Sequence, residues 1–181
     1  MIIADQLKQR NRIEYILYMW QVEDILRAYG CDFDRLKDGY ISRFQFQDEE
    51  QRQRTERWYA ELCEMMHGEG LVEGGHLQIN KNALQSLIEL HEQLLASSRF
   101  PYYREMYYKV LPYVVELRAK GGKKDEPELQ TCLDALYGIM MLRLQKRAVS
   151  ADTEKALQDI SALLGQLSDY YLKDKEEPIE F

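Results

Sequence analysis

Glutamate and histidine three residues apart are the spacing in this chain best suited to metal chemistry. Glu64 and His67 form one Glu-x-x-His pair, and Glu73 and His76 form another. Two such pairs, with two further helical carboxylates, hold the dinuclear centre of some helical bundles. The second pair encloses two glycines, which favours a loop, and the chain has only three histidines. A metal site at Glu64 and His67 is therefore a weak alternative. A histidine at the negative end of its helix dipole explains His67 equally well.

Other catalytic motifs are incomplete. His91 opens His-Glu-Gln-Leu-Leu, but the zinc-protease signature HExxH needs a histidine where this chain has Leu95. His91 lies on the apolar stripe of its predicted helix, which favours a hydrogen-bonded core residue. GxSxG and GxxxxGK[ST] do not occur, and Cys63 and Cys132 lie on apolar helical faces, as buried cysteines do. We therefore predict no catalytic residues, no metal and no cofactor, and we favour a non-enzyme.

Charged residues follow a tryptophan in the first long apolar segment, EYILYMWQVEDILRA. Helical steps of 100° place Asp24 on the face of Trp20 and Glu23 in a narrow polar seam. Both carboxylates lie within helical reach of Arg27. One interpretation is an ion cluster where the helix leaves the core. The other is a small-molecule pocket near Trp20 that includes His91, because a buried charge is costly unless it is paired or serves a ligand.

Tyrosines are unusually frequent, with 13 in 181 residues, and five of them fall in YYREMYYKVLPY. Pro112 in this segment removes a helical hydrogen bond, which predicts a kink. Core packing explains these tyrosines, and so does an interface or pocket, because tyrosine joins a large apolar ring to a polar tip. The candidate pocket or interface residues are Trp20, Glu23, Asp24, Arg27, His91, Tyr103, Tyr107 and Tyr108.

The chain resembles a known family over essentially its whole length. The similarity lies in EYILYMWQVEDILRA, WYAELCEMM, GHLQINKNAL, YYKVLPYVVELRAK and ALYGIMMLRLQK, in this order. These strings are similar to domain of unknown function 4924, a family of uncharacterised bacterial helical proteins. The resemblance implies a helical, stand-alone protein, and it implies no activity, cofactor or catalytic residue.

The elements that would position these residues are helices. Apolar residues recur with a period near 3.6, which predicts an all-α bundle of about seven helices. The first is expected from about Ala4 to Tyr29. It is apolar on two opposite faces, so we expect it to be buried between neighbours at the centre of the bundle. The other helices are expected after Asp32, at 48–67, from Asn80, from Pro101 to Gly121, from 125–127 and from 150–152.

The length, cysteine count and net charge of the chain limit its domain organisation and the classes of partner it can have. A chain of 181 residues is expected to form one domain, residues 1–173, with a loose charged tail at 174–181. Three widely spaced cysteines favour a reducing cytoplasm over a disulfide framework. A net charge of -7 argues against nucleic acid as the main partner. No apolar run reaches the roughly 18 residues of a membrane span, and the N-terminus does not match a signal peptide.

The leading hypothesis is a non-enzymatic interaction or scaffold protein that acts through its Tyr-rich helical surface, as a homodimer or with another protein. The second hypothesis is a small-molecule-binding protein or enzyme with the pocket near Trp20, Asp24, Arg27 and His91. The sequence identifies no ligand.

Overall fold

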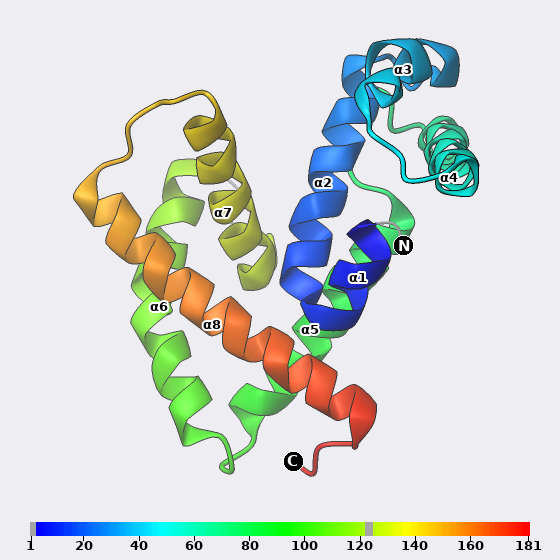
Figure 1. Cartoon of the computed structure of the whole chain (residues 1–181). Helices are drawn as coiled ribbons and strands as arrows, with labels where there is room; N and C mark the ends of the chain where they lie inside the picture. The colour runs from blue at the N-terminus through cyan, green and yellow to red at the C-terminus, as the bar shows by residue number, and fades with distance from the viewer. Residues whose placement is uncertain (1–2, 122–124) are drawn as a thin grey trace. The chain divides into compact units, whose positions relative to one another are not determined.

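The computed structural model describes residues 3–121 and 125–181 (Figure 1). Within these residues the chain forms eight α-helices, one 3-10 helix and no strand. The elements are α1 (Ile3–Arg10), α2 (Arg12–Ala28), α3 (Phe33–Gly39), η1 (Ile41–Arg43), α4 (Glu49–Gly68), α5 (Gln78–Ala96), α6 (Pro101–Gly121), α7 (Glu128–Leu144) and α8 (Ala151–Glu176). The predicted all-α class is confirmed. None of the described helices is both long and apolar enough to cross a bilayer.

The first predicted helix is two helices, because Asn11 interrupts it. The Asn11 Oδ1 atom accepts a hydrogen bond of 3.1 Å from the backbone N–H of Ile13, which makes Asn11 the N-cap of α2. The Ser168 hydroxyl donates to the same oxygen at 3.1 Å and accepts from the backbone N–H of Arg12 at 2.9 Å. The helical period continues across the break, so the apolar pattern alone predicts a single helix.

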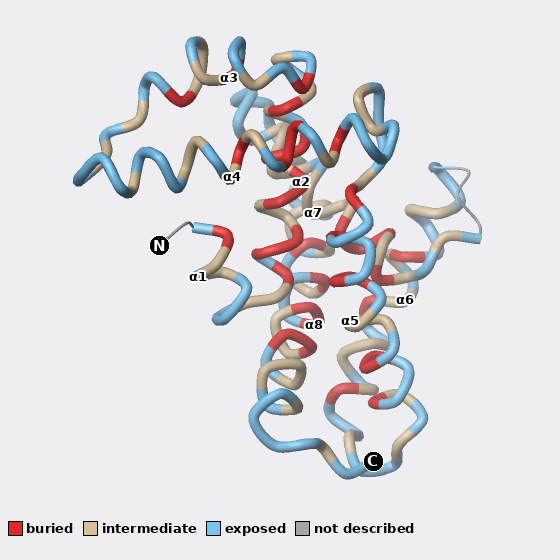
Figure 2. The backbone as a smooth tube through the Cα atoms, turned by 90° about the vertical axis from the view of Figure 1, so that its right-hand side faces the viewer, coloured by how far each residue is buried: buried red, intermediate tan, exposed pale blue. Residues whose placement is uncertain are grey.

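Helix α2 is buried on two opposite sides. Ile16 and Trp20 are buried on one side, and Val22 and Leu26 are buried on the other, while Leu17 is half-buried. This confirms the prediction that the helix has neighbours on both faces. In Figure 2 the buried residues recur along α2, whereas the first half of α4 is mostly exposed. The polar segment QRQRTER forms this exposed half of α4.

The chain divides into two compact units. The first contains the described residues up to 83 except 11–13, and the second contains 11–13 and the described residues from 84 onward. In the first unit, α3 packs against η1 and α4. In the second unit, α6, α7 and α8 each pack against the other two (Figure 1).

The single domain of residues 1–173 stays a prediction. It requires both units to unfold together, so calorimetry of the full chain is expected to give one cooperative transition. Two separate transitions would contradict it. Helix α8 continues to Glu176, three residues into the segment expected to be a tail.

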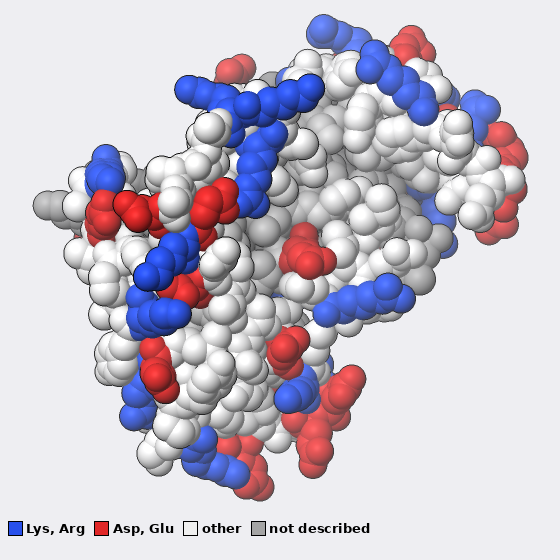
Figure 3. Space-filling model, turned by 60° about the vertical axis from the view of Figure 1, so that its left-hand side comes forward, with Lys and Arg blue, Asp and Glu red and all other residues white. Residues whose placement is uncertain are grey.

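The charged side chains of both signs are mixed on the face in Figure 3. In the left half of that view, acidic and basic side chains alternate down the surface. This mixed pattern is typical of a solvated protein surface.

Candidate functional site

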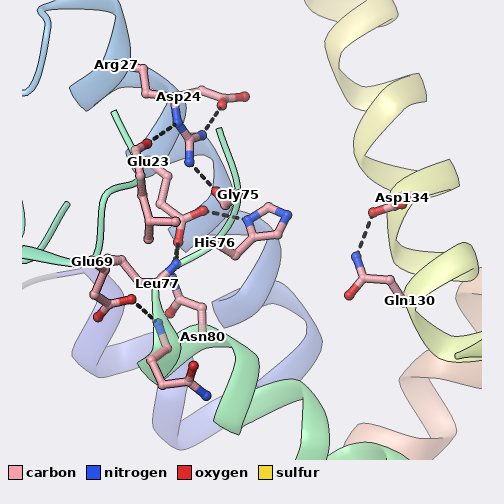
Figure 4. A network of polar contacts seen from close by, with 12 residues as sticks. Glu23, Asp24, Arg27, Glu69, Gly75, His76, Leu77, Asn80, Gln130 and Asp134 are labelled. Carbon is pink, nitrogen blue, oxygen red and sulfur yellow. Dashed lines mark hydrogen bonds and ion pairs between the residues drawn. The ribbon is translucent and has the colours of Figure 1, made fainter. Parts of the chain in front are cut away.

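Three hydrogen bonds converge on the buried carboxyl group of Glu23 (Figure 4). Its Oε2 atom lies 2.6 Å from Nδ1 of His76. Its Oε1 atom accepts from the backbone N–H of Leu77 at 2.9 Å and from the side-chain amide of Asn80 at 2.6 Å. Glu23 has no exposed surface. One residue of α2 therefore holds the end of the connector 69–77 and the first turn of α5.

His76 also packs against a tryptophan of α2. Its ring stacks on Trp20 with 4.3 Å between centroids and 18° between planes. The spacing Glu73-Gly-Gly-His76 suggested a metal pair, but the carboxylate that contacts His76 is Glu23, 53 residues away in sequence. The chain folds back between them, so no local motif predicts this contact.

Arg27 binds the connector to α2 at two further points. Its guanidinium donates to Oδ1 of Asp24 at 2.9 Å, to the carbonyl of Leu71 at 3.1 Å and to the carbonyl of Gly75. The Asp24 side chain is 51% exposed. Helical geometry placed Asp24 on the apolar face of Trp20 and Glu23 in a polar seam. The structure shows the reverse, because Glu23 is buried and Asp24 is exposed. Connector residues bond Glu23, so its burial needs no ligand.

The remaining histidine candidate belongs to a different cluster. Trp20, Glu23, Asp24 and Arg27 lie in the first unit. The second unit contains His91, Tyr103, Tyr107 and Tyr108. The pocket that would unite His91 with the tryptophan cluster stays a prediction.

His91 forms a buried hydrogen bond with Tyr103. The Nδ1 atom of His91 lies 2.7 Å from the Tyr103 hydroxyl, and the Tyr107 ring packs edge-on at 5.4 Å. Burial lowers the pKa of His91 to about 4, although the negative charge of Glu128 opposes the shift. Burial raises the pKa of Tyr103, and the pKa of Tyr107 rises to about 12 through burial and a hydrogen bond with Glu128. A neutral pair of this kind holds α5 to α6.

The outer face of α6 carries a regular exposed stripe. The helix continues through Pro112, and Tyr108 and Val115 are 61% and 59% exposed. We define the α6 seam as the exposed residues Pro101, Glu105, Tyr108, Pro112, Val115 and Ala119. Their steps of four and three residues are those of a coiled-coil seam. Tyr108 is thus a surface residue, while Tyr103 is fully buried.

The predicted metal pair has an incomplete set of ligands. Glu64 and His67 are both exposed, and Nε2 of His67 lies 3.2 Å from the carbonyl of Cys31. The part of the chain that the structure describes contains no group of three or more His, Cys, Asp or Glu side chains that could hold a metal ion.

A second candidate site was missed in the sequence. In the first unit, aromatic side chains of α2, α4 and the chain between α3 and α4 line a pocket of about 480 Å³. Its aromatic residues are Tyr18, Tyr40, Phe44, Phe46, Trp58 and Tyr59. The only local signal is the segment Tyr-Ile-Ser-Arg-Phe-Gln-Phe at 40–46, whose aromatic rings lie outside any long helix.

Comparison with known proteins identifies the family. No curated protein and no solved structure matches this chain. One family model, described as Domain of unknown function (DUF4924), matches residues 1–178. The match confirms the resemblance found in the helical segments, and the chain belongs to the family of domain of unknown function 4924.

Proposed function

We propose that this protein is a non-enzymatic interaction protein of the cytoplasm that associates with a second copy of itself through the α6 seam. The observation that carries the proposal is the exposed seam with Tyr108 and Val115 at helical spacing. An unpartnered helical stripe of this kind is suited to packing against another helix. The three free, buried cysteines support a reducing compartment.

The charges beside the seam favour a second copy as the partner. Glu105 lies in the seam, and Lys109, Glu116 and Lys120 lie beside it, and all four are exposed. If a second α6 packs antiparallel with its centre near Pro112, Glu105 faces Lys120 of the second copy and Lys109 faces Glu116. Every pair then has opposite charges, and two-fold symmetry forms each pair twice. This self-complementary order specifies the direction of packing.

Three of these charges already form ion pairs within one molecule. Lys109 pairs with Asp159 at 2.6 Å, and Lys120 pairs with Glu116 at 2.6 Å within the same helix. The Lys120–Glu116 pair is exposed on both sides and contributes about 1 kcal/mol or less, so its exchange for intermolecular pairs has a small cost. The Asp159 side chain is only 13% exposed, so Lys109 keeps this partner while its exposed side faces the second copy. The seam has few large apolar residues, so we expect a weak dimer with a small interface.

A charge-swap series tests the dimer. Lys109→Glu and Glu116→Lys each place like charges opposite one another twice, so each is expected to weaken dimerisation at least tenfold. The double variant restores opposite charges and is expected to dimerise like the wild type. Sedimentation equilibrium of the full chain from about 10 to 500 µM covers the affinity expected for a small interface.

Lys155→Glu on α8 is the matched control for Lys109→Glu, because it makes the same change in net charge at an exposed position outside the seam. Its dimer affinity is expected to equal that of the wild type. Thermal melts of all variants verify that the fold is intact. A wild type that stays monomeric at the highest concentration, or a double variant as weak as the single ones, contradicts the proposal.

A further inference from the structure

The pocket of the first unit is a preformed aromatic box. The rings of Tyr40 and Phe44 lie 4.9 Å apart at 74°, and those of Trp58 and Tyr59 lie 4.9 Å apart at 74°. Tyr40 and Tyr59 meet at 84°. Edge-to-face pairs of this kind stabilise one another, so the walls keep their orientation without a ligand. A volume of about 480 Å³ is within the range of small-molecule sites.

The lining of this pocket is uncharged. Beside the aromatic rings it contains Ile3, Gln45, Gln51 and Thr55. Burial raises the pKa of Tyr59 and of Tyr18, so these phenols are neutral at physiological pH. Neither a carboxylate that would balance a cation nor a basic group that would bind an anion lines the pocket. The walls are therefore suited to a neutral molecule.

One polar group at the pocket is positioned to donate a hydrogen bond. The Oε1 atom of Gln51 accepts from the backbone N–H of Gln47 at 2.7 Å, which fixes the side chain and leaves its amide nitrogen as a donor. The Thr55 hydroxyl donates to the carbonyl of Gln51 at 2.8 Å. The first turn of α4 therefore offers a donor beside flat apolar walls.

We infer that this pocket binds a small uncharged aromatic molecule of one or two rings that carries a hydrogen-bond acceptor at its edge. The rings would stack on or meet the edges of Trp58, Tyr40 and Phe44, and the acceptor would receive the Gln51 amide. The inference is independent of the dimer, because the α6 seam lies in the other unit.

Ligand-observed NMR of the full chain tests the site with three probes of similar size. The probes are 2-naphthol, which is neutral, 2-naphthoate, which is an anion, and phenyltrimethylammonium, which is a cation. We expect 2-naphthol to bind with a dissociation constant below about 1 mM and at least tenfold more tightly than either ion. The cation is the stringent comparison, because aromatic faces attract it.

Two variants locate the binding. Trp58→Ala removes one wall, and Thr55→Leu adds bulk at the pocket, so each is expected to weaken 2-naphthol binding at least tenfold. Tyr102→Ala is the control, because it removes an exposed tyrosine of the second unit that lies outside the α6 seam, and it is expected to leave binding unchanged. Far-ultraviolet circular dichroism of each variant verifies folding, and Thr55→Leu keeps the test valid if Trp58→Ala unfolds.

The inference is overturned if 2-naphthol does not bind, if either ion binds as tightly, or if binding persists in both folded pocket variants. The outcome is separate from that of the charge-swap series. A failed dimer leaves the pocket intact, and an empty pocket leaves the α6 seam intact.

Discussion

Glu23→Ala is expected to lower the free energy of unfolding by about 3 to 5 kcal/mol, because the change leaves buried partners of a charged group without an acceptor. The carboxyl group accepts from the backbone N–H of Leu77 and the side-chain amide of Asn80, and both of these residues are buried, so both donors lose their acceptor when it is removed. For a domain of this size the loss corresponds to a fall in Tm of about 10 °C. Urea unfolding followed by circular dichroism measures it.

The effect is also expected to be local. The backbone N–H of Leu77 is hydrogen-bonded to Glu23, so its hydrogen exchange is expected to accelerate strongly in the variant. Asp24→Asn is the matched control on the same helix turn. Its carboxylate is half exposed and pairs with Arg27, so we expect a loss of less than about 1 kcal/mol. Equal effects of the two substitutions would mean that Glu23 does not anchor the connector.

The helices could be predicted from the sequence because their signal is local. The apolar period and Gly30, whose φ of 70° ends α2 in the left-handed region, both act over a few residues. The break at Asn11 escaped prediction, because the apolar period continues across it and Ser168, its second hydrogen-bond partner, lies 157 positions away. Asparagine is a common N-cap residue, but an asparagine within an apolar period does not by itself require the helix to break.

The candidate site was predictable only where its contacts lie within one helix. The Asp24–Arg27 pair follows from a spacing of three residues. Helical geometry also placed Glu23 within reach of Arg27, but Glu23 bonds His76 and Asn80 across a reversal of the chain. The aromatic pocket could not be predicted for the same reason, because several separate segments of the chain form its walls. Contacts between segments far apart in the sequence depend on tertiary packing, which local sequence patterns do not predict.

The stability of the second unit is expected to fall as the pH is lowered from about 6.5 to 4, because unfolding releases the buried neutral His91 to bind a proton. Its pKa is about 4 in the folded chain, below the ordinary value of 6.5. The unfolded state therefore binds more protons in this range, and the contribution of His91 is complete above pH 6.5 and lost at pH 4. This difference between the folded and unfolded pKa values of His91 corresponds to a change of about 3 kcal/mol in the free energy of unfolding.

Comparing the pH dependence of unfolding in the wild type and in His91→Gln isolates this residue from the carboxylates, which titrate in both proteins. The variant is expected to be less stable at pH 7, because glutamine fits the His91–Tyr103 contact less well, but its stability is expected to change less between pH 6.5 and 4. His67→Gln, at an exposed position, is the control and should follow the wild type. Parallel curves for His91→Gln and the wild type would show that His91 is not held neutral by the fold, and α5 and α6 would then be joined by a pair that tolerates charge.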